Sequence, residues 1–128
     1  ARAEEAEAVV QAEVTGHDPH YGLTYLRFGG GVLTVPRDDL APGARVRVGL
    51  HARDISLALD RPERTSILNV LAGTVTELGE DGPTGVLVRL EAGGVPLLAR
   101  ITRKSRDQLG LEPGTAVYAQ IKSVALAG

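Results

Sequence analysis

Hydrogen-bond donors gather in the second half of this chain, where short strands are expected to begin or turn. Ser66 and Asn69 lie on the stretch 65–71, and Lys122 and Ser123 follow an apolar run near the end of the chain. These side chains carry N–H or O–H groups at neutral pH, and none of them is a carboxylate. A charge-assisted hydrogen bond contributes about 1.5–3 kcal/mol, so such a group suits a small oxyanion.

Thr102 and Ser105 add two hydroxyls on the first turn of the one clear helix that the pattern predicts, over residues 102–109. Thr102 can cap this helix, and the free N–H groups of a first helical turn favour an anion. A structural interpretation is also open, because Ser and Thr at a helix start commonly act only as caps. Lys122 can equally be a solvated surface cation. The residue types alone do not decide between an anion site and ordinary structure.

The composition indicates a small all-β protein that must position these donors. The 128 residues suffice for one ordinary domain or two very small ones that share a core. Aromatic residues make up only 3%, so Val, Leu, Ile and Ala must form the core. Sixteen Gly and seven Pro recur between the apolar runs, which favours many turns between short strands.

Apolar alternation predicts ten strands. They are expected at 9–15, 23–28, 32–35, 45–50, 55–59, 69–78, 86–90, 95–101, 117–121 and 124–126. Loops are expected at 16–22 and 79–85, and the lead-in 1–8, which is rich in good helix formers, is expected to be helical or frayed. The clearest alternation is at 45–50. It predicts that Val46, Val48 and Leu50 point inward and that Arg45, Arg47 and Gly49 point outward.

The two halves of the chain resemble each other. LAPGARVRVGL at 40–50 matches LEPGTAVYAQI at 111–121, at a constant offset of 71 residues. This predicts an internal duplication and two fused OB-like barrels, at residues 1–62 and 63–128, with the short helix only in the second. His51 and Ala52 stand opposite Lys122 and Ser123, so we expect the first barrel to be mainly structural.

Several other functions are disfavoured. The net charge of −2 and the scarcity of aromatics argue against nucleic acid, despite four arginines between residues 45 and 61. His17, Asp18 and His20 offer too few ligands for a strong metal site, and His51 with Asp54 lacks a nucleophile. No Cys and no membrane-length apolar run is present. We therefore expect neither an enzyme nor a metalloprotein. Because the chain begins with Ala1, we also expect it to be a piece of a longer protein.

The sequence resembles a known family. SILNVLAG at 66–73 and LLARITRKSRDQLGLEPGTAVYAQIKSVAL at 97–126 look like the molybdate-binding domain called Mop. More specifically, the whole chain resembles the C-terminal regulatory region of the ATP-binding subunit of bacterial molybdate ABC importers. YAQIKSV is the most specific piece, and T-S-I-x-N-V-L is the next.

The resemblance implies that molybdate or tungstate binds between Mop barrels, where two subunits meet. Seven residues match the family motif or its surroundings, with Ile67 contributing its backbone amide: Ser66, Ile67, Asn69, Thr102, Ser105, Lys122 and Ser123. Leu68 occupies a position where many members carry Arg. This departure removes a cation, which leaves Lys122 as the main charge.

The resemblance also implies a regulatory role. The expected partners are a second copy of the chain and, in the intact transporter, the membrane permease subunit at the cytoplasmic face of the inner membrane. ATP would bind only to a preceding domain, and bound oxyanion would inhibit transport. Two alternatives remain: a free-standing storage protein of two Mop modules, and a purely structural dimerisation barrel. The sequence does not rank molybdate against tungstate.

Overall fold

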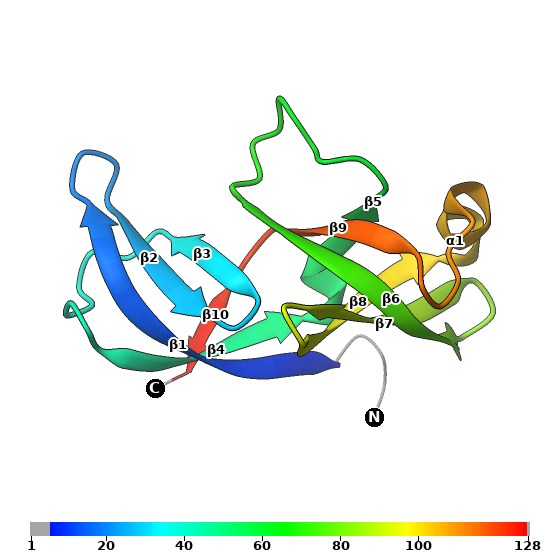
Figure 1. Cartoon of the computed structure of the whole chain (residues 1–128), viewed down its shortest axis with the longest axis horizontal. Coiled ribbons are helices and arrows are strands. Elements are labelled where there is room, and N and C mark those ends of the chain that lie inside the picture. Colours follow the sequence, from blue (N-terminus) through cyan, green and yellow to red (C-terminus); the bar gives the residue numbers. More distant parts are fainter. Residues whose placement is uncertain (1–5, 128) are drawn as a thin grey trace.

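The computed structural model describes residues 6–127. It contains two five-stranded antiparallel sheets, which lie side by side along the long axis of the molecule (Figure 1). In spatial order, the first sheet consists of β10 (Ala125–Ala127), β4 (Arg45–His51), β1 (Glu7–Asp18), β2 (Leu23–Phe28) and β3 (Gly31–Val35). The second consists of β5 (Ile55–Ala58), β9 (Ala116–Ile121), β6 (Asn69–Asp81), β7 (Gly85–Ala92) and β8 (Val95–Thr102).

The expected all-β fold of two OB-like units is confirmed. The sheets are curled, and α1 (Arg103–Leu109) is the one α-helix in the described residues; a short 3-10 helix, η2 (Ala52–Asp54), was not foreseen. Thr102 caps α1 as expected, because its hydroxyl accepts a hydrogen bond from the Ser105 amide at 3.0 Å. Gly110 ends the helix in the left-handed conformation, with φ of 64°.

The strand order agrees with the internal duplication. Read from one edge, β10, β4, β1, β2 and β3 take the same places as β5, β9, β6, β7 and β8. The edge strands are exchanged, since β5 follows β4 in sequence but pairs with β9, and β10 follows β9 but pairs with β4. Strand pairing thus crosses the predicted boundary between residues 62 and 63 in both directions. The different roles assigned to the two parts of the chain remain a prediction.

One apolar core extends through both sheets. It is made of Val, Leu, Ile and Ala side chains, joined by Phe28, which is 8% exposed. Leu26 and Leu33 of the first sheet and Leu90 and Leu97 of the second are fully buried. The scarcity of aromatics therefore does not prevent a closed core, because branched aliphatic side chains suit the faces of a sheet.

Two glycine turns meet at the junction of the sheets. The turn between β2 and β3 contains Gly29, the turn between β7 and β8 contains Gly93, and the two turns are adjacent in Figure 1. A Cβ atom on Gly93 would collide with the backbone carbonyl of Gly29, and Gly93 also has a positive φ of 55°. Glycine is required there for both reasons.

Some local expectations were wrong. Glu7 and Ala8 belong to β1 and not to a helical lead-in, because pairing with His51 and Leu50 overrides their helix propensity; residues 1–5 lie outside the described part. Gly49 pairs with the exposed Val9 and so lies on the outer face as expected, but it is buried there, because the Glu7 side chain and Ala125 of β10 lie beside it. Leu59 lies beyond β5 and is 43% exposed. Strands also extend into both predicted loops, as far as Asp18 in one and Asp81 in the other.

Candidate functional site

A cavity of about 300 Å³ lies where the first sheet meets the start of β6. Its wall combines residues from the two predicted barrels, the first module (1–62) and the second module (63–128). The place where they meet, at the start of β6, is the module junction. The lining residues are Leu23, Thr34, Pro36, Ser66, Ile67, Leu68, Asn69, Ile121 and Lys122. No carboxylate is among them, so nothing in the wall repels an anion.

Four of the seven predicted site residues line this cavity: Ser66, Ile67, Asn69 and Lys122. Ser66 is exposed, and the Ile67 amide donates to the Thr65 hydroxyl at 3.2 Å. That bond is local and exposed, so an anion can replace the Thr65 hydroxyl as the acceptor. The stretch 65–68 thus presents one hydroxyl and one exchangeable amide.

Lys122 supplies the only charge in the lining of the cavity. Its backbone N–H donates to the Asp54 carbonyl at 2.9 Å, which fixes the chain directly after β9 while the side chain stays exposed. Arg37 lies just beyond the lining residue Pro36, but its guanidinium donates two hydrogen bonds of 2.7 Å to Asp39. That pairing lowers the pKa of Asp39 and raises the pKa of Arg37, so the charge of Arg37 is already compensated.

Asn69 has a structural partner. Its Oδ1 accepts from the Thr34 amide at 2.7 Å, and its Nδ2 donates to the Thr34 carbonyl at 2.9 Å. The side chain is 7% exposed and joins the edge strand β3 to the start of β6. The carboxamide oxygen and one N–H are therefore committed, which leaves one N–H for a ligand. Its expected role as an anion ligand remains a prediction.

Thr102 and Ser105 lie at the other end of the second sheet. Asn69 at the start of β6 pairs with Ile121, whereas Asp81 at its end pairs with Gly85, which in turn pairs with Thr102. At roughly 3.3 Å per residue, the 13 residues of β6 extend for roughly 40 Å along the strand. Figure 1 shows α1 at the far end of the second sheet from the start of β6. One chain therefore cannot bring Thr102 and Lys122 to the same small ion.

The two hydroxyls on α1 are ordered relative to each other. Thr102 Oγ1 lies 3.0 Å from Ser105 Oγ and accepts from the Ser105 amide at 3.0 Å. Ser123 is exposed next to Lys122 and is not part of the cavity wall. The seven predicted residues thus form two groups: Ser66, Ile67, Asn69, Lys122 and Ser123 near the module junction, and Thr102 with Ser105 on α1.

The sequence analysis missed the contribution of the first module to the cavity. Leu23, Thr34 and Pro36 come from β2, from β3 and from the residue after β3. No motif marks them, because their place in the wall depends on how β3 packs beside β6. The hydrogen bonds between Asn69 and Thr34 are the contact that brings them there.

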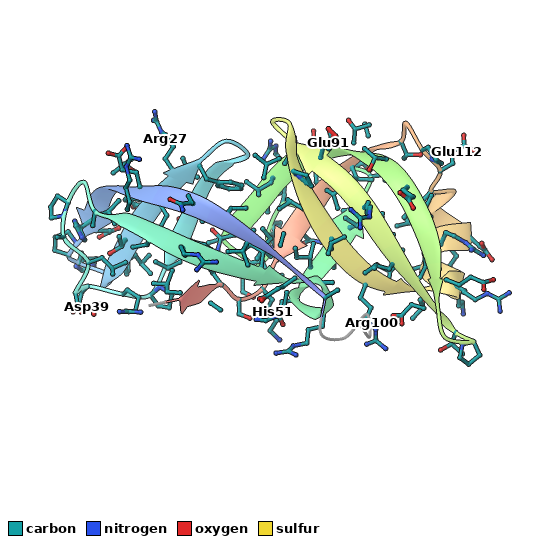
Figure 2. All side chains as sticks on the ribbon, turned by 90° about the horizontal axis from the view of Figure 1, so that it is seen from below. Arg27, Asp39, His51, Glu91, Arg100 and Glu112 are labelled. Atoms are coloured by element: carbon teal, nitrogen blue, oxygen red, sulfur yellow. The ribbon has the colours of Figure 1, made fainter. Side chains whose placement is uncertain are left out.

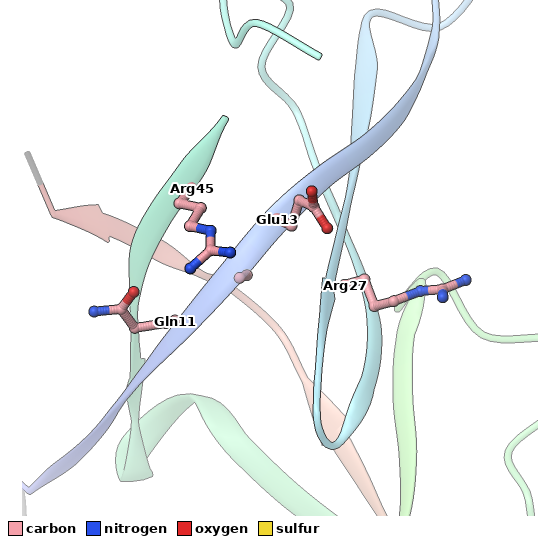
Figure 3. A pocket seen from close by; sticks show the side chains of 5 residues that line it. Gln11, Glu13, Arg27 and Arg45 are labelled. Atoms are coloured by element: carbon pink, nitrogen blue, oxygen red, sulfur yellow. The ribbon is translucent and has the colours of Figure 1, made fainter. Parts of the chain in front are cut away.

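A smaller cavity of about 150 Å³ on the outer face of the first sheet is a poorer anion site. Glu13 pairs with Arg27 on one side and with Arg45 on the other. Figure 3 shows the Glu13 carboxylate between the two strands that carry these arginines, with the Arg27 side chain directed away. The central carboxylate would repel a bound anion.

His17 and His51 each lie near a group of the first sheet or of the loop beside it. His17 Nε2 lies 2.7 Å from the Leu40 carbonyl, and no group of three or more metal-ligating side chains occurs within residues 6–127. His51, the counterpart of Lys122 in the first half, lies 3.4 Å from Glu7 through Nδ1. Figure 2 shows it on the same side of the molecule as Arg100. Because Glu7 adds a negative charge beside it, His51 does not reproduce the setting of Lys122.

The comparisons with known proteins identify the family. The model of the TOBE domain matches residues 65–127, the part of the chain that carries all seven predicted site residues. The chain carries a TOBE domain. No helix in the described part of this TOBE-containing chain is long and apolar enough to cross a membrane.

Relatives of this TOBE region are ATP-binding proteins of molybdenum import. ModC 1 of Azotobacter vinelandii is 56% identical over 126 residues, which cover 98% of this chain and 35% of the relative. ModC of Pseudomonas aeruginosa is 52% identical over 126 residues, covering 96% and 35%. The chain thus spans about a third of the length of these relatives, and the resemblance to their C-terminal region is confirmed.

A solved structure has the same fold. The cytoplasmic molybdate-binding protein ModG, in a crystal form with molybdate bound, superposes with a TM-score of 0.77 and 26% sequence identity. The match covers 94% of this chain and 94% of ModG. Both modules of the TOBE-containing chain therefore have counterparts in that protein.

Proposed function

We propose that this chain is the regulatory region of a molybdate importer and that it binds molybdate or tungstate. The observation that carries the proposal is the cavity at the module junction, where Ser66, Ile67 and Lys122 converge without a carboxylate. A tetrahedral dianion offers acceptors on every side, which suits an ammonium, a hydroxyl and an amide from separate segments. The molybdenum-import relatives and molybdate-bound ModG support this choice of anion.

The complete site is formed by two copies of the chain. Each copy has donors at the module junction and two further hydroxyls, Thr102 and Ser105, at the far end of the second sheet. These groups are too far apart to bind one ion within a copy, so α1 of one copy meets the junction of the other. A two-fold axis makes both such contacts equivalent and gives two anion sites per dimer.

Anion binding between copies provides a feedback signal. In the intact importer, the bound oxyanion holds two regulatory regions together at the cytoplasmic face and thereby favours an arrangement of the ATP-binding domains that does not transport. The anion shifts this equilibrium only by its difference in affinity for the two arrangements. The chain itself has no part in catalysis, since ATP binds to another domain of the longer protein, which also contacts the permease.

A second candidate function is molybdate storage. ModG is matched over 94% of its own length, so a protein of about this size can bind molybdate without an ATP-binding domain. The absence of the donor set from the first module counts against storage, because Lys122 and Ser123 are replaced there by His51 and Ala52. The ratio of anion to chain separates the two functions: about one supports the feedback site, and about two supports storage in both modules.

Mixing two variants tests the shared site. Lys122→Ala removes the junction charge, and the double change Thr102→Ala with Ser105→Ala removes the hydroxyls of α1. Each variant alone should bind molybdate weakly. After subunit exchange, about half of the dimers contain one copy of each variant, and each of these has one intact site, so about a quarter of the wild-type number of tight sites should return. A mixture that binds no better than its components would exclude a site shared between copies.

A further inference from the structure

We infer that Thr34 of the first module is a ligand of the anion, supplying its hydroxyl to the same cavity as Ser66 and Lys122. This inference rests on the proposed function and extends it. The first module then has a direct part in anion recognition, although its sequence offers no donor motif. Thr34, Ser66 and Lys122 reach the cavity from three separate segments: β3, the stretch that joins β5 to β6, and the residue after β9.

The first argument is that the Thr34 hydroxyl is uncommitted. Thr34 lines the cavity and is only partly buried. Its hydrogen bonds to Asn69 use its backbone N–H and carbonyl, and its hydroxyl has no protein partner within residues 6–127. Thr24 on the neighbouring strand differs, because its hydroxyl donates to the Arg37 carbonyl at 2.5 Å. An uncommitted hydroxyl in a cavity without carboxylates is available to an anion.

The second argument is that Thr34 is held in place. The Asn69 carboxamide bonds both backbone groups of Thr34, at 2.7 and 2.9 Å, so the position of Thr34 relative to β6 is fixed before an anion arrives. A donor that is already in position loses little conformational freedom on binding. Asn69 acts here as a positioning residue, and its buried side chain is suited to that role.

The third argument concerns charge. Leu68 lines the cavity and is 65% exposed. Its apolar side chain offers no hydrogen bond to an anion there. With Lys122 as the only cation, the remaining oxygens of a dianion need neutral donors. Thr34 and Ser66 are the two hydroxyl-bearing residues in the lining. Within one copy, the hydroxyl donors of the cavity therefore come from these two residues, to which α1 of the second copy adds Thr102 and Ser105.

The test measures molybdate affinity by calorimetry for Thr34→Val, Thr34→Ser and the wild-type chain. Val matches Thr in shape and keeps the backbone bonds to Asn69, so Thr34→Val should unfold at the wild-type temperature but bind molybdate roughly tenfold or more weakly. Thr34→Ser restores a hydroxyl and should return affinity to within about threefold of wild type. Thr76→Val changes an exposed threonine of β6 outside the cavity and should leave affinity unchanged.

The outcomes separate this inference from the proposed function. If Thr34→Val binds molybdate as tightly as the wild-type chain, the role of Thr34 is overturned and the proposed function still stands. Equal losses in Thr34→Val and Thr34→Ser also overturn it, since the hydroxyl would then not be the cause. If the wild-type chain does not bind molybdate, both proposals fail. A loss in Thr34→Val that Thr34→Ser reverses supports the assignment.

Discussion

The carboxamide of Asn69 forms two hydrogen bonds with the backbone of Thr34, one as acceptor at 2.7 Å and one as donor at 2.9 Å. In this way a single side chain from the start of β6 occupies the place that a neighbouring strand would take beside the edge strand β3. The contact joins the two modules and forms one wall of the candidate anion cavity. Asn69 therefore links the fold of the chain to the geometry of the site.

Replacing Asn69 by Ala should destabilise the chain by about 1–3 kcal/mol, because the two backbone groups of Thr34 lose their partners in a partly buried place. Urea unfolding, followed by circular dichroism, measures the change in the free energy of unfolding. Thr34→Val is the matched control, since it keeps both backbone bonds and should change that free energy by less than about 1 kcal/mol. Equal stability of Asn69→Ala and the wild type would show that the contact does not join the modules.

Because the two glycine turns are in contact, we expect alanine substitutions at Gly93 and Gly94 to differ strongly in their effect on stability. A Cβ atom on Gly93 would collide with the Gly29 carbonyl, whereas a Cβ atom on Gly94 would meet nothing within 4 Å. Both residues have positive φ, at 55° and 81°. Gly93→Ala should therefore cost about 3 kcal/mol or more, and Gly94→Ala only about 1–2 kcal/mol from backbone strain. Similar thermal unfolding of the two variants would argue against a tight junction.

Loss of the Lys122 charge should weaken molybdate binding by about tenfold or more, because a charge-assisted hydrogen bond is removed. Calorimetric titration measures this change. Arg27→Ala removes an exposed cation from the outer face of the first sheet, and it should leave the affinity nearly unchanged at physiological ionic strength. If both variants lose affinity equally, the anion is attracted by the overall charge of the chain and not by a local site.

Restoring a cation at position 68 should strengthen binding. Leu68 is 65% exposed at the cavity, so Leu68→Arg can reach the anion without disturbing the core, and we expect a gain of about tenfold. Leu59→Arg is the matched control, because Leu59 is also exposed, at 43%, on the same connecting segment but outside the cavity wall. The prediction fails if Leu68→Arg and Leu59→Arg bind molybdate with the same affinity.

Local patterns predicted the strands well, and long-range pairing explains where the predictions were wrong. Residues 23–28 and the cap at Thr102 follow directly from alternation and from helix-start chemistry. The exchange of β5 and β10 between the sheets has no signal in either strand, because a short apolar segment can pair with any free edge. The burial of Gly49 was missed partly for that reason, because Ala125 of β10 lies beside it together with the Glu7 side chain.

The candidate site was predicted by residue type but not by arrangement. Ser66 and Lys122 were chosen as donors, and both line one cavity. Thr102 could not be placed from spacing in sequence, because its distance from Lys122 depends on the length and pairing of β6. Thr34 was missed because an isolated threonine in a strand has no distinctive context. Its relation to the cavity arises only from the contact with Asn69.

Calorimetric titration of the folded chain with molybdate tests the central claim most directly. We predict a saturable heat of binding with about one anion per chain, accompanied by formation of a dimer in light scattering of the same sample. Circular dichroism that shows the expected strand content would establish that the protein is folded. The absence of saturable heat up to millimolar molybdate, in a chain folded by that criterion, would contradict the claim that this region senses the anion.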